Sequence, residues 1–462
     1  MYNTIFRTAG AIVSLTLVAC GSEPEPKPWG EAETDLTVVE WIDAEYAAGR
    51  EPTYAHPLDE AAAKFVRLAL AMGKIDANYV DAYHGPKTWS EAAETWEPTS
   101  DDLLARARAL RTEIEQVTPR SEADGVRIEQ LLKQLRAMQR RLKFLQGDEP
   151  SFKVEAEAIY DVIVPTYDLS EYDAVLGEID ALLPGEGSIA ERVDAFRNSL
   201  AIPTDKLEVV FERATAECRE RTKAHYDLPE GESFRMEFVN DKPWSGYNYY
   251  QGDYESLIQI NTDFPIVIDR AVDLGCHEGY PGHHVWNLFI ESELVKERGW
   301  IEYSVNPLFS PFGTIAEGSA NYGIELAFPG DEKIAFERDV LFPMAGLDPA
   351  KAETLAELNA LTRQLSHATN EVARRVIDGE LTRADAAPLM QKYYLASLEK
   401  SRQRVRFVDT YRAYVINYNI GLDLAGAYVE AAGEDEDARW AAFKEMLIRP
   451  MTASDIVEAL EE

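Results

Sequence analysis

Three of the seven histidines of this 462-residue chain lie within eight positions, in the segment LGCHEGYPGHHVWN. His277 is followed directly by Glu278, and His283 and His284 follow a Pro-Gly pair. In a helical His-Glu-x-x-His sequence the two imidazoles lie one turn apart on one face and bind Zn²⁺, while the glutamate acts as general base. Here Pro281 occupies the position of the second histidine, so a metal site requires a break in the helix.

The Pro-Gly pair is suited to make that break. In a straight helix His283 would point about 240° away from His277, and His284 would lie about 10 Å further along the axis. Proline disfavours helical geometry at the preceding residue, and glycine accepts unusual dihedral angles. We therefore predict a bulge or kink that brings His283 to the metal and leaves His284 to hydrogen-bond a carboxylate or substrate. If the helix bends only mildly, His284 is the ligand instead.

A third ligand is expected in the segment TIAEGSANYGIEL. Glu317 lies there in a predicted helix whose neighbouring residues are small, which lets two helices approach closely. Zn–O and Zn–N bonds of about 2.0–2.2 Å require such an approach. Asn321, one turn after Glu317, and Asp273, one turn before His277, are candidate partners for the outer nitrogen of a ligating histidine.

The segments HEGYPGHHVWN and AEGSANYGIEL together resemble the bacterial domain-of-unknown-function 885 family, with DANYVDAYHGP and YVINYNIGL as further markers. That family is related in pattern to the glutamate-ligand zinc metallopeptidases. The resemblance implies His277, His283 and Glu317 as metal ligands and Glu278 as general base. It also implies a role for Tyr418 in stabilising an oxyanion, with a packed helix aromatic as the alternative.

These features predict a zinc metallopeptidase in which metal-activated water hydrolyses peptide bonds. Arg406 is a candidate for binding a substrate carboxylate, and the segment 255–262 for pairing with an extended peptide. The alternatives are a metal-dependent amidase or esterase acting on a non-peptide substrate, and a non-catalytic metal-containing envelope binding lipoprotein. Glu278 disfavours the latter, because a structural metal needs no base. Peptide length, endo- or exo-specificity and oligomeric state stay open.

The N-terminus predicts a bacterial lipoprotein. Residues 1–19 contain a short apolar core and end in LVA before Cys20, where a signal peptidase would cut and a diacylglycerol would be attached. Residues 20–32 are proline-rich and predict a tether. Gly21 suits sorting to the outer membrane, with the enzyme on its periplasmic face. An ordinary secretory signal is the alternative.

The overall charge and the two remaining cysteines limit the environment and the partners. A formal net charge of −36 argues against nucleic acid or anionic lipid as the main partner, since both would be repelled. Cys218 and Cys276 would lie in an oxidising compartment, where two thiols can pair. The helical segment around Cys218 favours a small packing residue there, and the sequence leaves the pairing open.

The distribution of apolar residues predicts a mainly α protein with a large multi-helix, metallopeptidase-like fold. An N-terminal helical part covers 33–227, and its clearest helix is the segment IEQLLKQLRAMQRRLKFLQG, expected in a helical hairpin. A catalytic part covers 228–462 and begins with one small antiparallel sheet before residue 262. Pro265 suits the first turn of the helix that would carry His277.

Overall fold

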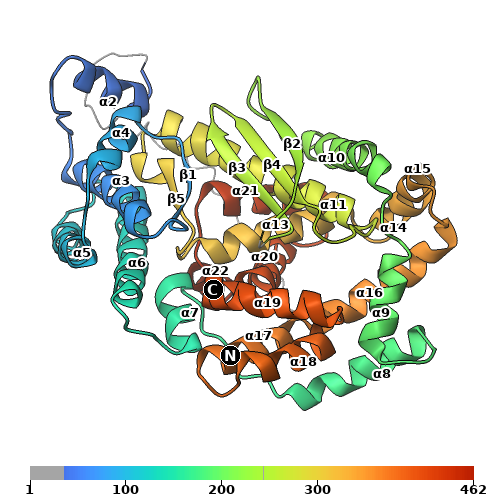
Figure 1. Ribbon diagram of the computed structural model, residues 1–462. Helices are drawn as coiled ribbons and strands as arrows, with labels where there is room; N and C mark the ends of the chain where they lie inside the picture. Colours follow the sequence, from blue (N-terminus) through green and yellow to red (C-terminus); the bar gives the residue numbers. More distant parts are fainter. Residues whose placement is uncertain (1–35, 243, 462) are drawn as a thin grey trace.

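The computed structural model describes residues 36–242 and 244–461, in which the chain is mainly helical (Figure 1). Helices make up 66% of the structure and strands 7%, which confirms the predicted mainly α class. The predicted signal peptide and tether lie outside the described residues. Within the described part, no helix combines the length and the apolar character needed to cross a membrane.

Helices α2 to α10 form the N-terminal part. Helix α6 contains the predicted apolar stripe, and Leu131, Leu135, Met138 and Leu142 in it are fully buried. It packs against α5 in the predicted hairpin. The bounds are α2 (Val38–Ala47), α3 (Pro57–Ile75), α4 (Lys87–Thr95), α5 (Ser100–Ile114), α6 (Glu122–Leu145), α7 (Phe152–Tyr160), α8 (Asp173–Leu182), α9 (Ile189–Asn198) and α10 (Leu207–Lys223).

The three strands expected before the histidine segment form a mixed sheet and not the predicted antiparallel one. Strands β2 (Ser233–Val239), β3 (Gly246–Gly252) and β4 (Glu255–Asn261) lie in the order β2-β4-β3, with β2 parallel and β3 antiparallel to β4. The central position goes to β4 because Ile258 and Ile260 on it are fully buried. Both edges of β4 are therefore paired, so the prediction that this strand takes up a peptide is wrong.

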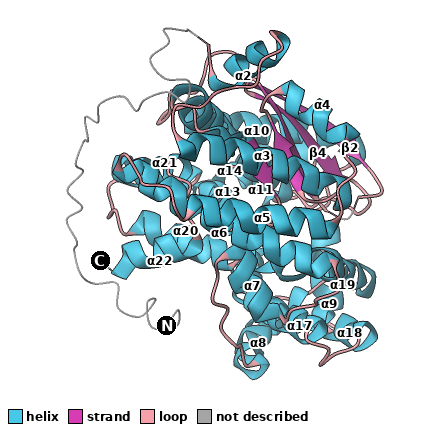
Figure 2. Cartoon of the chain, turned by 90° about the vertical axis from the view of Figure 1, so that its left-hand side faces the viewer, coloured by secondary structure: helices cyan, strands magenta, loops and turns pink. Residues whose placement is uncertain are grey.

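A second, two-stranded sheet was not expected from the sequence. Strand β1 (Val80–Tyr83) of the N-terminal part pairs antiparallel with β5 (Val305–Pro307) of the C-terminal part, residues 228–462. Figure 2 shows the strands gathered on one side of a molecule that is otherwise helical. The pairing joins residues far apart in the sequence and brings the DANYVDAYHGP segment next to the C-terminal part.

The central helices begin later than the sequence suggested. Helix α11 (Arg270–Leu274) continues into a π-helical turn, η3 (Gly275–Gly279), and is followed by α12 (His283–Phe289), the π-helical segment η4 (Ile290–Glu297), the 3₁₀ turn η5 (Ile301–Ser304) and α13 (Gly313–Ala327). The helix predicted from Pro265 is absent up to Asp269. Instead, the backbone there hydrogen-bonds to residues 200–202 in an extended bridge, so a tertiary contact overrides the local signal.

The C-terminal helices complete the fold. The predicted boundary at residue 228 falls between α10 and β2, and the main apolar core contains side chains from both predicted parts. A smaller core joins α8 and α9 to α16–α19. The bounds are α14 (Glu332–Phe336), η6 (Glu337–Leu341), α15 (Phe342–Ala345), α16 (Ala352–Gln364), α17 (Ser366–Ile377), α18 (Arg383–Tyr394), α19 (Leu398–Tyr411), η8 (Arg412–Tyr418), α20 (Ile420–Glu430), α21 (Glu436–Ile448) and α22 (Ala453–Glu461), with short 3₁₀ turns η1 (Leu169–Tyr172), η2 (Thr204–Lys206) and η7 (Pro349–Lys351).

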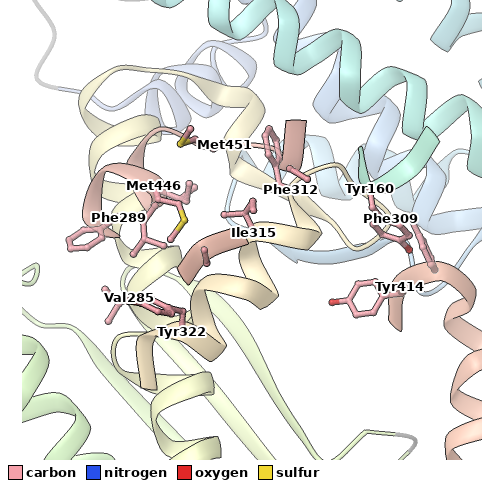
Figure 3. Close-up of a cluster of buried hydrophobic side chains, with 14 of the residues drawn as sticks. Tyr160, Val285, Phe289, Phe309, Phe312, Ile315, Tyr322, Tyr414, Met446 and Met451 are labelled. Atoms are coloured by element: carbon pink, nitrogen blue, oxygen red, sulfur yellow. The ribbon is translucent and has the colours of Figure 1, made fainter. Parts of the chain in front are cut away.

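Part of the main core fixes α12 against α13. Figure 3 shows Val285 and Phe289 of α12 and Ile315 of α13 beside Met446 of α21. All four side chains are buried. Burying an apolar side chain of this size contributes about 1.5–3 kcal/mol. This packing holds the two helices that carry the histidine segment and Glu317 at a fixed separation.

Candidate metal centre

The Pro-Gly pair ends the helix and turns the chain back on itself. After the π-helical turn η3, Tyr280 is extended, with φ −125° and ψ 119°. The N–H of Gly282 donates to the carbonyl of Cys276 at 3.0 Å. A Cβ at Gly282 would lie 1.9 Å from the carbonyl oxygen of His277, so only glycine fits there. Residue 283 therefore starts a new helix directly beside His277, so the predicted bulge or kink takes the form of a full break between two helices.

This break brings His283 to His277. The two imidazole rings are nearly perpendicular, with centroids 4.7 Å apart. Glu317 from α13 joins them: its Oε2 lies 3.3 Å from Nε2 of His277 and 3.8 Å from Nε2 of His283. One ligand atom from each of the three residues lies within 4.8 Å of the others. Two atoms bonded to one tetrahedral Zn²⁺ at about 2.1 Å lie about 3.4 Å apart, which is close to the two distances from Glu317 to the histidines.

The protonation of His277 is determined by Asn321. Nδ1 of His277 lies 3.0 Å from Oδ1 of Asn321, whose Nδ2 donates to the carbonyl of Tyr418 at 3.0 Å. Because the amide oxygen only accepts, Nδ1 carries a proton. Nε2 is the ring nitrogen that faces Oε2 of Glu317. Nε2 is therefore the nitrogen through which His277 could hold a metal.

Glu317 is oriented by a tyrosine that the sequence analysis did not select. The Tyr414 hydroxyl donates to Oε1 of Glu317 at 2.5 Å, while Oε2 is buried without a hydrogen-bond partner among the described residues. Burial acts to raise the pKa of Glu317, but contacts with His277 and His283 lower it well below its usual range. Glu317 is therefore a carboxylate with one oxygen free for a metal. Tyr414 lies in the quoted segment YVINYNIGL, four residues before Tyr418, but no motif marked it.

Carboxylates surround His283. Burial acts to lower the pKa of His283, but Glu317, Glu278 and Asp81 raise it more, to about 9. The cluster therefore stabilises positive charge, as expected for a centre built to hold a divalent cation.

Glu278 lies beside this cluster with its carboxylate enclosed. It is 4% exposed, and burial raises its pKa although His277 and His283 act in the opposite direction. Strand β3 passes directly over it: a Cβ at Gly246 would lie 2.8 Å from Oε1 of Glu278. Asn248 on the same strand donates to the backbone carbonyl of Glu278 at 2.6 Å. A buried carboxylate with a raised pKa beside a metal site has the properties of a general base.

The expected close approach of helices occurs at two glycines of α13. A Cβ at Gly318 would lie 2.2 Å from the backbone carbonyl carbon of Gly421 on α20, so these two helices touch through their backbones. At Gly323 a Cβ would lie 2.8 Å from Pro281, so the Pro-Gly turn also rests on α13. These contacts bring Glu317 within reach of the two histidines.

His284 points away from this centre. It is fully buried, with Nδ1 2.7 Å from the Ser256 hydroxyl and Nε2 3.3 Å from Glu232. Because a carboxylate only accepts, Nε2 carries the proton. Tyr280 also donates to Glu232. His284 therefore ties the Pro-Gly turn to the sheet, through the kind of carboxylate contact that was predicted.

Two other predicted residues have different positions from those expected. Asp273 forms ion pairs with Lys333 and Arg270, so Asn321 is the partner of His277. Arg406 is exposed on α19, whereas the guanidinium of Arg404 lies 5.9 Å from the centre of the Tyr418 ring.

The walls of the site come from β1 and η8. Asp81 accepts hydrogen bonds from Tyr247 and, at 3.3 Å, from Asn306. Burial raises the pKa of Asp81 to about 6, and the charges of Glu317 and Glu278 act in the same direction. Tyr418 is half-buried, and burial followed by the charge of Glu317 raises the pKa of its phenol well above the usual value. Its proton is therefore retained and can be donated. Asp81 belongs to DANYVDAYHGP, and the pairing of β1 with β5 together with the contact of β1 with Tyr247 of β3 places it here.

A disulfide bond joins the π-helical turn that carries His277 to α10. Cys218 of α10 is bonded to Cys276, the residue before His277, and both are fully buried. A Cβ at Gly275 would lie 2.8 Å from Oγ1 of Thr215, so the π-helical turn is pressed against α10. The pairing that the sequence left open is thus present.

The chain matches no family model and no curated protein. Two similar solved structures are each described as a "putative lipoprotein". The one from Colwellia psychrerythraea has 15% sequence identity and a TM-score of 0.48, over 80% of this chain and 72% of that chain. The one from Shewanella oneidensis, described as of unknown function, has 14% identity and a TM-score of 0.42, over 81% of this chain and 76% of that chain. The resemblance to the domain-of-unknown-function 885 family therefore rests on the quoted motifs.

Proposed function

We propose that the protein is a zinc-dependent metallopeptidase. The observation that carries this proposal is the convergence of His277, His283 and Glu317 on one point beside the buried Glu278. Two neutral imidazoles and one carboxylate are a ligand set used by catalytic zinc, which keeps a further position open for water or substrate. Zinc bound there would act as a Lewis acid on a carbonyl and lower the pKa of a water.

In this proposal Glu278 moves the protons. Its carboxylate accepts a proton from the attacking water and returns it to the leaving amine. Burial under β3 raises its pKa, which makes the carboxylate a stronger base toward the attacking water. Asn321 keeps the proton of His277 on Nδ1, so Nε2 stays available. Tyr414 keeps Oε2 of Glu317 turned toward the histidines.

Tyr418 is the proposed donor to the oxyanion that forms during hydrolysis. Its phenol keeps its proton, and its ring lies 5.8 Å from that of Tyr414. Because Tyr414 is already bonded to Glu317, Tyr418 is the better placed of the two to donate to substrate.

The proposed location is the bacterial cell envelope, with a lipid anchor at Cys20 and sorting to the outer membrane. The support is the LVAC segment, which lies outside the described residues. Wild-type protein should partition with membranes and carry a diacylglycerol on Cys20, and Cys20→Ala should lose both. An unmodified, soluble mature protein would remove the anchor from the proposal.

The function is tested by separating metal binding from catalysis. Wild-type protein should contain about one zinc per chain and hydrolyse a peptide library read by mass spectrometry. Glu278→Gln should keep the zinc and lose hydrolysis, because the base acts on water and does not hold the metal. His277→Ala and Glu317→Ala should lose the zinc. Wild-type hydrolysis by Glu278→Gln would refute the mechanism, and cleavage of non-peptide amides or esters alone would favour that alternative.

A further inference from the structure

Helix α19 carries an unusual concentration of positive charge for this protein. The chain has a formal net charge of −36, yet Lys400, Arg402, Arg404 and Arg406 lie within seven residues of one another. In Figure 1 this helix lies below the three-stranded sheet. Among these cations, Arg404 lies against the aromatic side chains next to the metal centre.

Arg404 is held in position by aromatic rings. Its guanidinium carbon lies 4.8 Å from the centre of the Phe407 ring and 5.9 Å from each of the Tyr418 and Tyr394 rings. Cation–π contacts of this kind orient a guanidinium without neutralising it. Within 36–242 and 244–461, Arg404 forms no ion pair, whereas Arg374 on α17 is paired with three carboxylates.

Tyr418 connects this cation to the metal centre. Its ring lies 5.9 Å from the guanidinium carbon of Arg404 and 5.8 Å from the ring of Tyr414, whose hydroxyl donates to Glu317. Tyr418 therefore contacts the cation of α19 and reaches the candidate metal centre through Tyr414. The acidic groups of the site are Glu278, Glu317 and Asp81, and Asp81 is held on β1 by hydrogen bonds from Tyr247 and Asn306.

We propose that Arg404 binds a carboxylate of the substrate, namely the free C-terminus of a peptide cleaved close to that end. The inference rests on the proposed peptidase function and adds its substrate class. A planar guanidinium binds a carboxylate through two parallel hydrogen bonds, and Arg404 has its donors free of any acidic partner among the described residues. The acidic groups near Asp81 would repel the same carboxylate, so the C-terminal end of the peptide points toward α19.

Binding is measured apart from catalysis with the metal-loaded Glu278→Gln protein. The probes are N-acetylated hexapeptide pools without Asp or Glu, made either as free acids or as C-terminal amides, with equilibrium dialysis as the readout. We expect the acid pool to bind about 10- to 100-fold more tightly than the amide pool. Adding Arg404→Gln should abolish this preference and leave amide binding unchanged. Arg402→Gln, an exposed arginine on the same helix, should keep the preference.

The possible results of these measurements distinguish the proposed role of Arg404 from the proposed peptidase function. Equal binding of acid and amide pools, or loss of preference in Arg406→Gln and not in Arg404→Gln, would overturn the role of Arg404. If an amide pool that contains Asp or Glu gains affinity through Arg404, and free acids bind no better than amides, Arg404 binds a side-chain carboxylate. That result would overturn the proposed specificity for a free C-terminus. An Arg404-dependent preference in a protein that hydrolyses no peptide would support the binding site and refute the peptidase.

Discussion

The imidazole of His277 and the side-chain amide of Asn321 form one hydrogen-bonded unit, with Nδ1 and Oδ1 3.0 Å apart. The same amide donates to the backbone carbonyl of Tyr418. One side chain of α13 therefore fixes the tautomer of a metal-site histidine and the position of the segment that carries the proposed oxyanion donor.

Replacement of Asn321 should weaken metal binding without removing it. Asn321→Ala takes away the acceptor for Nδ1–H, so the ring of His277 can rotate and Nε2 is less well aimed. We expect zinc affinity to fall about 10- to 100-fold, measured by competition with a chromogenic chelator. Asn198→Ala, an exposed asparagine on α9, is the control and should not change the affinity. An unchanged affinity in Asn321→Ala would remove this role.

Replacing His283 and replacing the adjacent His284 should have different effects on zinc binding. His283→Ala should abolish zinc binding, because Nε2 of His283 belongs to the cluster. His284→Ala should keep the zinc but lower the free energy of unfolding by about 1–3 kcal/mol, because Glu232 and Ser256 lose a buried partner. It should also lower turnover, since the Pro-Gly turn is less well held. Elemental analysis and urea unfolding test both variants, and the reverse pattern would reassign the ligand to His284.

The contact between α13 and α20 should not tolerate a methyl group. Gly318→Ala would place a Cβ 2.2 Å from the backbone of Gly421, so one helix must move. We expect a loss of about 1–3 kcal/mol in unfolding free energy and weaker zinc binding, because Glu317 moves with α13. Gly125→Ala on α6 is the matched control: its Cβ would meet nothing within 4 Å, and it should stabilise the protein by about 0.4–1 kcal/mol.

Loss of the disulfide should destabilise the fold. Cys218 and Cys276 are 58 residues apart, and closing a loop of that length is expected to contribute up to about 4 kcal/mol. The double variant Cys218→Ala/Cys276→Ala should therefore unfold at lower urea concentration, and the wild type should shift similarly after reduction. A wild type that contains two free thiols, as measured by thiol titration under denaturing conditions, would contradict the bond.

The Glu232 cluster should make stability depend on acid pH. Burial acts to raise the pKa of Glu232, but hydrogen bonds from His284, Tyr280 and Arg219 lower it from 4.5 to about 2. A lowered pKa in the folded state contributes stability that is full above pH 4.5 and is lost as the pH falls toward 2.

Urea unfolding between pH 7 and pH 2 measures this contribution. Glu232→Gln should be less stable than wild type at pH 7, and the difference should shrink as the pH approaches 2. Glu230→Gln, an exposed glutamate two positions earlier, should follow the wild-type curve throughout. A constant difference for Glu232→Gln would mean that the carboxylate charge is not what stabilises the turn.

Local patterns were sufficient to predict some elements of the fold and part of the site. The apolar spacing predicted α6 in the N-terminal part, and the Pro-Gly pair predicted an interruption between His277 and His283. Small residues around Glu317 predicted close helix packing, because a missing side chain has a direct steric consequence. Each of these inferences depends on residues only a few positions apart.

Contacts between distant segments were not accessible in the same way. Tyr414 and Asp81 reach the site only through tertiary packing, and their local sequences are ordinary. The strand order of the three-stranded sheet depends on which strand is buried at its centre. A short alternating pattern does not specify that strand. The extended backbone after Pro265 likewise follows from pairing with residues 200–202. Arg404 was missed because two arginines two residues apart point in different directions on a helix.

Because β1 pairs with β5, the candidate metal centre can be assembled only after most of the chain has been synthesised. Asp81 and Asn306, which bond across these strands, are 225 residues apart in the chain. A chain emerging from a ribosome or a translocation channel therefore presents Asp81 long before its partner strand exists, and Glu317, Arg404 and Tyr414 follow later still. Non-local pairing of this kind is formed late in folding. Until synthesis reaches α19 and η8, the unfinished protein thus carries the parts of the centre in separate, unassembled segments.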